Sequence, residues 1–89
     1  MGYKVSPPEE LMNVIGYNLM QSKQFDRAFF YLMQNIDNYP KSFNAYDSMG
    51  DLCEAKGEHG DAKVCYQRSL AIKETPGTRR KLEQLNKGK

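Results

Sequence analysis

Residues 46–53 read YDSMGDLC, and this stretch decides the fold because residues 12–19, MNVIGYNL, carry the same pattern 34 positions earlier. In each stretch two large residues stand three positions apart, glycine follows directly, and Leu19 or Cys53 comes three positions later. Positions spaced by three and four residues lie on one face of an α-helix. The two stretches therefore predict two helices that present the same face, one in each copy of a repeat.

Glycine inside a predicted helix needs a packing reason, because it disfavours a helix interior by about 1 kcal/mol relative to alanine. Gly16 and Gly50 are the two glycines of the pattern, and Ala28 and Ala62 follow them at the same spacing. A residue without a Cβ lets a second helix approach closely. We expect Ala28 and Ala62 to meet the glycines from the second helix of each pair.

A repeat with this period and this order of large and small positions resembles the tetratricopeptide repeat (TPR). The resemblance implies an all-α, TPR-type helical repeat in a single domain over residues 1–89. Repeat one covers about 9–42, repeat two about 43–76, and a capping helix about 77–87. Turn residues such as Gly57 and Pro40 divide the chain into helices at about 7–22, 26–38, 42–56, 61–73 and 77–87.

The last helix departs from the repeat pattern. Arg80 and Glu83 stand where a further repeat would place large residues, and only Leu82 and Leu85 are apolar. A thin apolar edge with a polar outer face is what a stack of helices needs at its end. We expect this helix to cap the stack.

Three segments carry a narrower resemblance, namely GYKVSPPEEL at residues 2–11, NYPKSFNAYDSMGD at 38–51 and SLAIKETP at 69–76. They resemble the C-terminal repeat segment of bacterial esterases of the α/β-hydrolase superfamily, related to siderophore esterases, over nearly the whole chain. The resemblance implies that residues 1–89 are an appendage of a longer protein whose catalytic domain lies upstream. None of that domain's catalytic residues has a counterpart in this chain.

The first helix of each pair builds the inner face of a TPR stack. The family's geometry implies eight candidate groove residues, Asn13, Tyr17, Met20, Gln21, Asn44, Asp47, Asp51 and Glu54. TPR modules that hold a C-terminal carboxylate use Lys, Arg and Asn on this face, whereas here it is acidic, which favours a basic or mixed peptide. The alternative is that Asp47 and Asp51 are solvated, or pair with Arg79 and Arg80 of the last helix.

The second helix of repeat one carries more apolar surface than one packed face requires. At 100° per residue, Phe29, Phe30 and Met33 lie outside the stripe that contains Ala28 and Leu32. Repeat two has Lys63, Val64 and Gln67 at the matching positions. Such a patch predicts an interface, either a dock for an upstream domain or a homodimer surface. The alternative is a locally broadened core beneath the N-terminal segment around Tyr3 and Val5.

Composition and motifs exclude several function classes. The chain is 39% hydrophobic and 27% charged, as in globular proteins, and has no apolar run long enough for a membrane span. It lacks a phosphate-binding glycine loop, a nucleophile elbow and a zinc-protease motif, and His59 is its only histidine. We therefore expect no catalytic residue, no cofactor and no metal, with Cys53 and Cys65 reduced and not bonded to each other.

Charge is distributed unevenly along the chain. Residues 1–72 hold seven Lys/Arg and nine Asp/Glu, net −2, whereas residues 73–89 hold six and two, net +4. These observations predict a non-catalytic module that binds a protein or peptide, or an upstream hydrolase domain of the same chain. One alternative is a lid that helps form the active site of that hydrolase. A lower-ranked one is nucleic-acid contact through the basic C-terminal helix, whose charge also suits the helix dipole.

Overall fold

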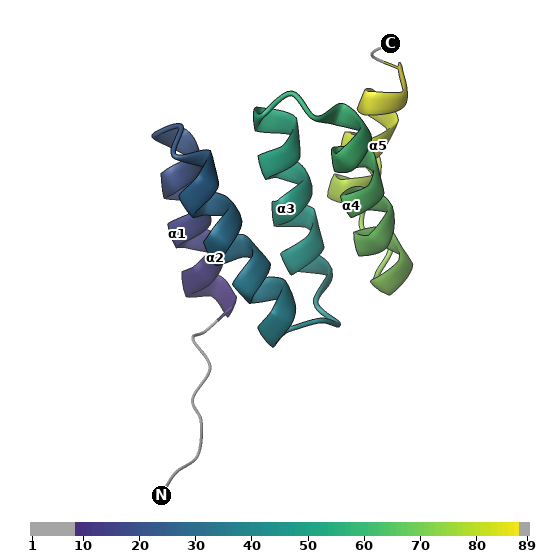
Figure 1. Cartoon of the computed structure of the whole chain (residues 1–89). Coiled ribbons are helices and arrows are strands. Elements are labelled where there is room, and N and C mark those ends of the chain that lie inside the picture. The colour runs from purple at the N-terminus through teal and green to yellow at the C-terminus, as the bar shows by residue number, and fades with distance from the viewer. Residues whose placement is uncertain (1–8, 88–89) are drawn as a thin grey trace, which may run out of the picture.

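The computed structural model describes residues 9–87, and within this range it contains five α-helices joined by short turns (Figure 1). They are α1 (Glu9–Gln21), α2 (Phe25–Asn38), α3 (Phe43–Ala55), α4 (His59–Ile72) and α5 (Pro76–Lys87). The predicted all-α fold is confirmed, and each predicted boundary inside the described range lies within two residues of the observed one. The predicted helix start at residue 7 lies outside the described residues.

The repeat in the sequence is also a repeat in the helices. Every boundary of the α3–α4 pair lies one full repeat period after the corresponding boundary of the α1–α2 pair. The two helices of each pair pack against each other, α3 also packs against α1 and α2, and α5 packs against α4. The helices therefore form one continuous stack, with α1 and α2 at one end and α5 at the other (Figure 1).

The turn inside each pair contains one residue in the left-handed backbone region. Gly57 has φ +81°, and Lys23, the equivalent residue of repeat one, has φ +62°. Glycine adopts this conformation freely, while a residue with a Cβ does so at a cost. Gly57 thus ends α3 as the sequence predicts, and repeat one makes the same turn with a less suitable residue.

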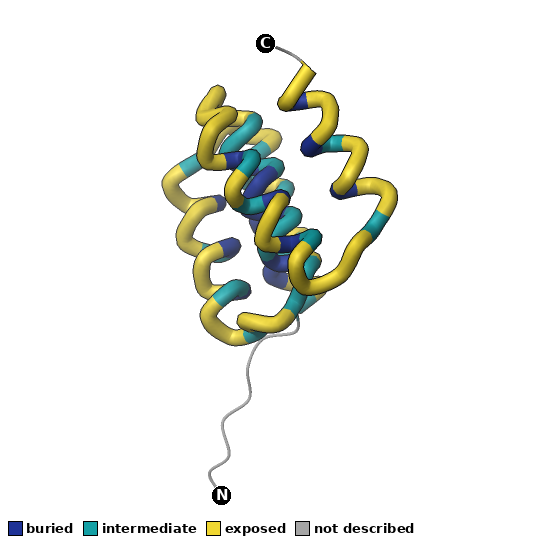
Figure 2. Tube along the Cα trace, turned by 90° about the vertical axis from the view of Figure 1, so that its right-hand side faces the viewer, coloured by how far each residue is buried: buried dark blue, intermediate teal, exposed yellow. Residues whose placement is uncertain are grey.

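The core divides into two clusters that join neighbouring layers of the stack. One cluster comprises Ala28 and Leu32 of α2 with Met49 and Leu52 of α3. The other comprises Ala62, Tyr66, Leu82 and Leu85, and it seats α5 on the second pair. Figure 2 shows the buried positions along one side of α5, with its other sides exposed. Leu82 and Leu85 thus form the predicted apolar edge, to which buried Thr78 adds.

The two repeat glycines face large side chains. A Cβ at Gly16 would lie 2.5 Å from Cδ2 of Leu32, and one at Gly50 would lie 2.4 Å from Cε1 of Tyr66. Ala28 and Ala62 are fully buried, but the atoms nearest a Cβ at Gly16 and Gly50 belong to Leu32 and Tyr66, so the alanines do not make the closest approach there.

We predict that Gly50→Ala lowers the free energy of unfolding by about 1–3 kcal/mol, because the new methyl group overpacks a buried ring. Gly60→Ala is the matched control, since a Cβ there has no atom within 4 Å. It should be neutral or should stabilise by up to about 1 kcal/mol through helix propensity. Urea unfolding followed by circular dichroism measures both. Equal stability of the two variants would contradict the close approach at Gly50.

Candidate docking groove

The acidic residues of the predicted inner face are hydrogen-bonded within the chain. Asp51 accepts from the hydroxyl of Tyr17, and the Tyr66 hydroxyl, which has one proton to donate, lies 2.6 Å from Oδ1 of Asp51 and 2.8 Å from Oε1 of Glu54. Asp47 accepts from the hydroxyl of Thr78 on α5 at 2.7 Å. These carboxylates of α3 therefore link α3 to α1, α4 and α5 through hydrogen bonds within the chain.

Lys81 of α5 supplies the positive charge for this cluster. Its ammonium group lies 3.1 Å from Oδ2 of Asp47 and 3.0 Å from Oδ1 of Asp51. Burial alone would lower the pKa of Lys81, but the hydrogen bonds to Asp51 and Asp47 outweigh it and the net shift is upward. The acids do pair with the last helix, but not through the predicted Arg79 and Arg80. Arg79 instead donates to Glu74 at 2.7 and 2.9 Å.

The other inner-face candidates are scattered among different roles. Asn13 accepts a hydrogen bond from buried Asn35 at 3.0 Å, and Met20 packs against the first core cluster. Gln21 and Asn44 are exposed. Lys81 offsets only one of the three negative charges of Asp47, Asp51 and Glu54, because the hydroxyls of Thr78 and the two tyrosines are neutral donors, so these groups keep a net charge of −2. The preference for a basic or mixed peptide stays a prediction.

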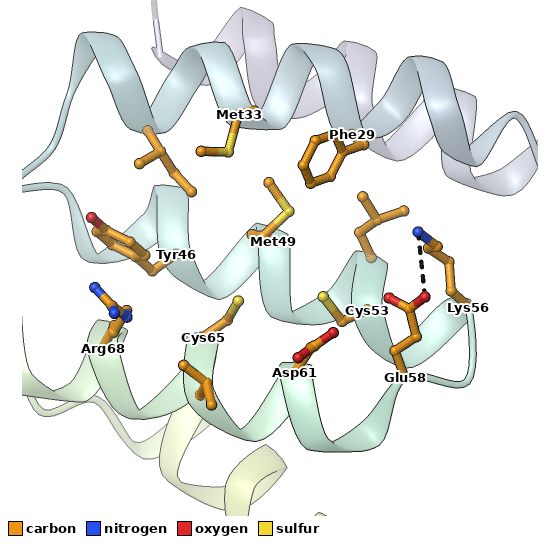
Figure 3. A pocket seen from close by; sticks show the side chains of 13 residues that line it. Phe29, Met33, Tyr46, Met49, Cys53, Lys56, Glu58, Asp61, Cys65 and Arg68 are labelled. Atoms are coloured by element: carbon orange, nitrogen blue, oxygen red, sulfur yellow. Dashed lines mark ion pairs between the residues drawn. The ribbon is translucent and has the colours of Figure 1, made fainter.

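The opposite side of α3 forms the floor of a groove of about 390 Å³ (Figure 3). α2 provides one wall and α4 the other. The apolar lining residues are Phe29, Met33, Ile36, Tyr46, Met49, Leu52 and Val64. Two of the three residues predicted to form an interface, Phe29 and Met33, thus lie at this groove, 47% and 39% exposed.

Charged residues stand at the two ends of the groove. Figure 3 shows Arg68 beside Tyr46 at one end, and Lys56, Glu58 and Asp61 at the other. Lys56 and Glu58 form an ion pair at 3.6 Å. The groove therefore has an apolar middle, a cationic end at Arg68 and an acidic residue, Asp61, towards the far end.

Phe30 does not belong to this groove. It is 56% exposed and lines a separate hollow with Ile15 and Leu19 of α1. Its ring packs edge-to-face on Tyr31, with centroids 5.4 Å apart. The patch predicted as one surface is therefore two surfaces, because successive residues of a helix point about 100° apart.

Cys53 and Cys65 line the groove as free thiols, as the sequence predicts. Burial, with the neighbouring Cys53, raises the pKa of Cys65 to about 12. Burial also raises the pKa of Cys53. Both side chains are therefore protonated at neutral pH and are weak nucleophiles.

The described residues 9–87 contain neither a candidate membrane span nor a candidate metal cluster. No helix there is long and apolar enough to cross a bilayer, and no cluster of three His, Cys, Asp or Glu side chains is arranged to hold a metal ion. His59 is exposed at the start of α4. Comparisons of the chain with protein-family models, with curated proteins and with solved structures find no match.

The sequence did not predict the groove side chains that α3 and α4 contribute. Met49 and Leu52 are apolar residues of a packed helix face, and nothing in the sequence distinguishes such residues from residues that line a groove. Val64 stood at the position matching Phe30, and that correspondence was the available signal that repeat two also exposes an apolar residue there.

We predict that the chain loses stability as pH rises above about 10, the ordinary pKa of tyrosine. Burial first, and then the hydrogen bond to Asp51, raises the pKa of both Tyr17 and Tyr66. A group with a higher pKa in the folded state binds its proton more tightly there, so stability present below the unfolded pKa is lost at higher pH. Lys81 acts in the same direction.

An alkaline titration that records tyrosinate absorbance and circular dichroism together measures this effect. Two of the six tyrosines should ionise only as the helices unfold. In the Tyr17→Phe/Tyr66→Phe variant that late phase should disappear. If the complete tyrosinate signal of the unmodified chain develops near pH 10 with helicity intact, the two buried hydroxyl contacts are wrong.

Proposed function

We propose that these residues form a non-catalytic TPR-type module that binds another protein surface through the groove between α2 and α4. One observation carries the proposal. Phe29, Met33 and Val64 flank a single groove while remaining 47%, 39% and 48% exposed. Apolar surface gathered in this way on one concave site is typical of a place where a partner inserts side chains.

The TPR assignment rests on the repeat period and on the packing at its small positions. Both pairs place a large residue of the second helix over a glycine of the first. This is a physical reason for the pattern at residues 12–19 and 46–53, and the helices of the two pairs also have identical lengths.

The chemistry of the groove favours docking over catalysis. Its thiols are held protonated by burial, and its charged groups stand at the ends, away from the apolar middle. A side chain such as Leu or Phe buried there would gain about 1.5–3 kcal/mol. Arg68 and Asp61, towards opposite ends, would orient a partner that carries complementary charges.

The resemblance to esterase C-terminal segments suggests the partner. On that basis the groove is a dock for the hydrolase domain of a longer chain, and a separate protein is the other form of the same function. In both cases these residues position a partner and do not take part in the reaction themselves.

Site-specific photocrosslinking in the source cells tests this function. A benzophenone amino acid at position 33 lies on the groove, and one at position 67, the matching exposed position of repeat two, lies outside it. We expect position 33 to give one discrete adduct, identified by mass spectrometry, and position 67 to give none. Val64→Lys, a change at an exposed groove residue, should abolish the adduct without lowering helicity.

An adduct with an upstream domain of the same polypeptide would appear as an internal crosslink, and one with a separate protein as a larger species. Either kind of adduct supports docking in the groove if the Val64→Lys variant abolishes it. The same adducts from positions 33 and 67, or no adduct at position 33, would contradict the proposal.

A further inference from the structure

At the α1 end of the stack, some helix positions are exposed whose counterparts in repeat two are buried. Leu11 and Val14 of α1 are 50% and 55% exposed. Their counterparts one repeat period later, Ala45 and Ser48, are buried on α3, the helix that packs against repeat one. At these two positions this end presents larger apolar residues than α3 buries, whereas exposed Asn18 stands where α3 buries Leu52, and no helix among residues 9–87 lies over them.

A hollow of about 420 Å³ lies on the same end of the molecule. It is lined by Ile15, Leu19, Asp26, Arg27, Phe30 and Tyr31. Moved forward by one repeat period, five of these six become Met49, Cys53, Asp61, Val64 and Cys65, which all line the groove between α2 and α4. The hollow thus corresponds to the floor and one wall of that groove, and among residues 9–87 no helix provides the other wall, as α2 does for repeat two.

We infer that this end face, defined by Leu11, Val14, Ile15, Leu19 and Phe30, binds an amphipathic helix of another protein. The interface between the two repeats specifies its chemistry. The helix should present a small residue followed four positions later by a large apolar one, as Ala28 and Leu32 do in the first core cluster. Apolar residues one and five positions after the small one, equivalent to Phe29 and Met33, would close the hollow.

A second copy of this chain is a poor source of such a helix. The small–large stripes of its α2 and α4 are already buried, with Ala28, Leu32, Ala62 and Tyr66 fully inaccessible. Its other end is closed by α5, which turns Arg80 and Glu83 outward. Stacking of one copy on another end to end would therefore set charged residues against Leu11 and Val14.

The probe for this site is a capped peptide with the sequence of residues 24–39, which contains the α2 stripe. Its control is the same peptide with Ala28→Asp and Leu32→Asp. The peptide is titrated into the full chain and followed by amide chemical shifts. We expect saturable binding with the largest shifts at Leu11, Val14 and Phe30, and no binding of the control peptide.

Variants of the chain separate this site from the groove. Val14→Lys, and independently Leu11→Lys, should weaken peptide binding at least about tenfold, as expected for a charge placed in the centre of an apolar interface. Both positions are exposed, so the fold should persist. Val64→Lys, which alters the groove of the proposed function, should leave this binding unchanged.

Three results would overturn the inference. One is an absence of peptide binding, or binding that Val14→Lys leaves intact. Another is binding lost only in Val64→Lys, which would put the peptide in the groove. The third is a dimer in light scattering that Val14→Lys dissociates, which would make a second copy the occupant. The two proposals can fail separately. If the peptide binds in a Val14-dependent way but position 33 gives no crosslink, this inference stands and the proposed function does not.

Discussion

The contact of the Tyr66 ring with Gly50 is the constraint on which the rest of the structure depends. The ring is fully buried, and it lies so close to the glycine that a Cβ would be 2.4 Å from it. This approach brings α4 against α3 and directs the phenolic hydroxyl to Asp51 and Glu54. Asp51 then also binds Tyr17 of repeat one and Lys81 of the cap. One packing contact thus places the carboxylate that links both repeats to α5.

This arrangement places the hydrogen-bonded carboxylates and the apolar groove on opposite sides of α3. The carboxylates of α3 bond to neighbouring helices, and Lys81 of the last helix pairs with two of them, Asp47 and Asp51. The apolar groove lies on the opposite side of α3, where Phe29 and Met33 of repeat one face Val64 of repeat two. Buried Met49 and Leu52 belong to the first core cluster and also line the groove, so the core extends beneath this exposed apolar surface.

Helix positions were predictable because the repeat period fixes them, and glycine at two equivalent places indicated close packing. The exposure of Phe29, Phe30 and Met33 was predictable from angles around a helix. Side-chain partners were not, because an angle on a helix does not say which neighbour a long side chain reaches. Lys81 therefore took the place predicted for Arg79 and Arg80, and Leu32 and Tyr66 covered the glycines that Ala28 and Ala62 were predicted to meet. That Phe29 lies at the groove above α3, while Phe30 lies at a hollow beside α1, could be seen only once the helices were placed in space.

A double-mutant cycle on Tyr17→Phe and Lys81→Met tests most directly whether Asp51 joins the repeats to the cap. Both side chains bond to Asp51, one from α1 and the other from α5. If Asp51 couples them, the two losses in unfolding free energy will not add, with an interaction energy of about 0.5–3 kcal/mol. Losses that add within measurement error would contradict a shared link at Asp51.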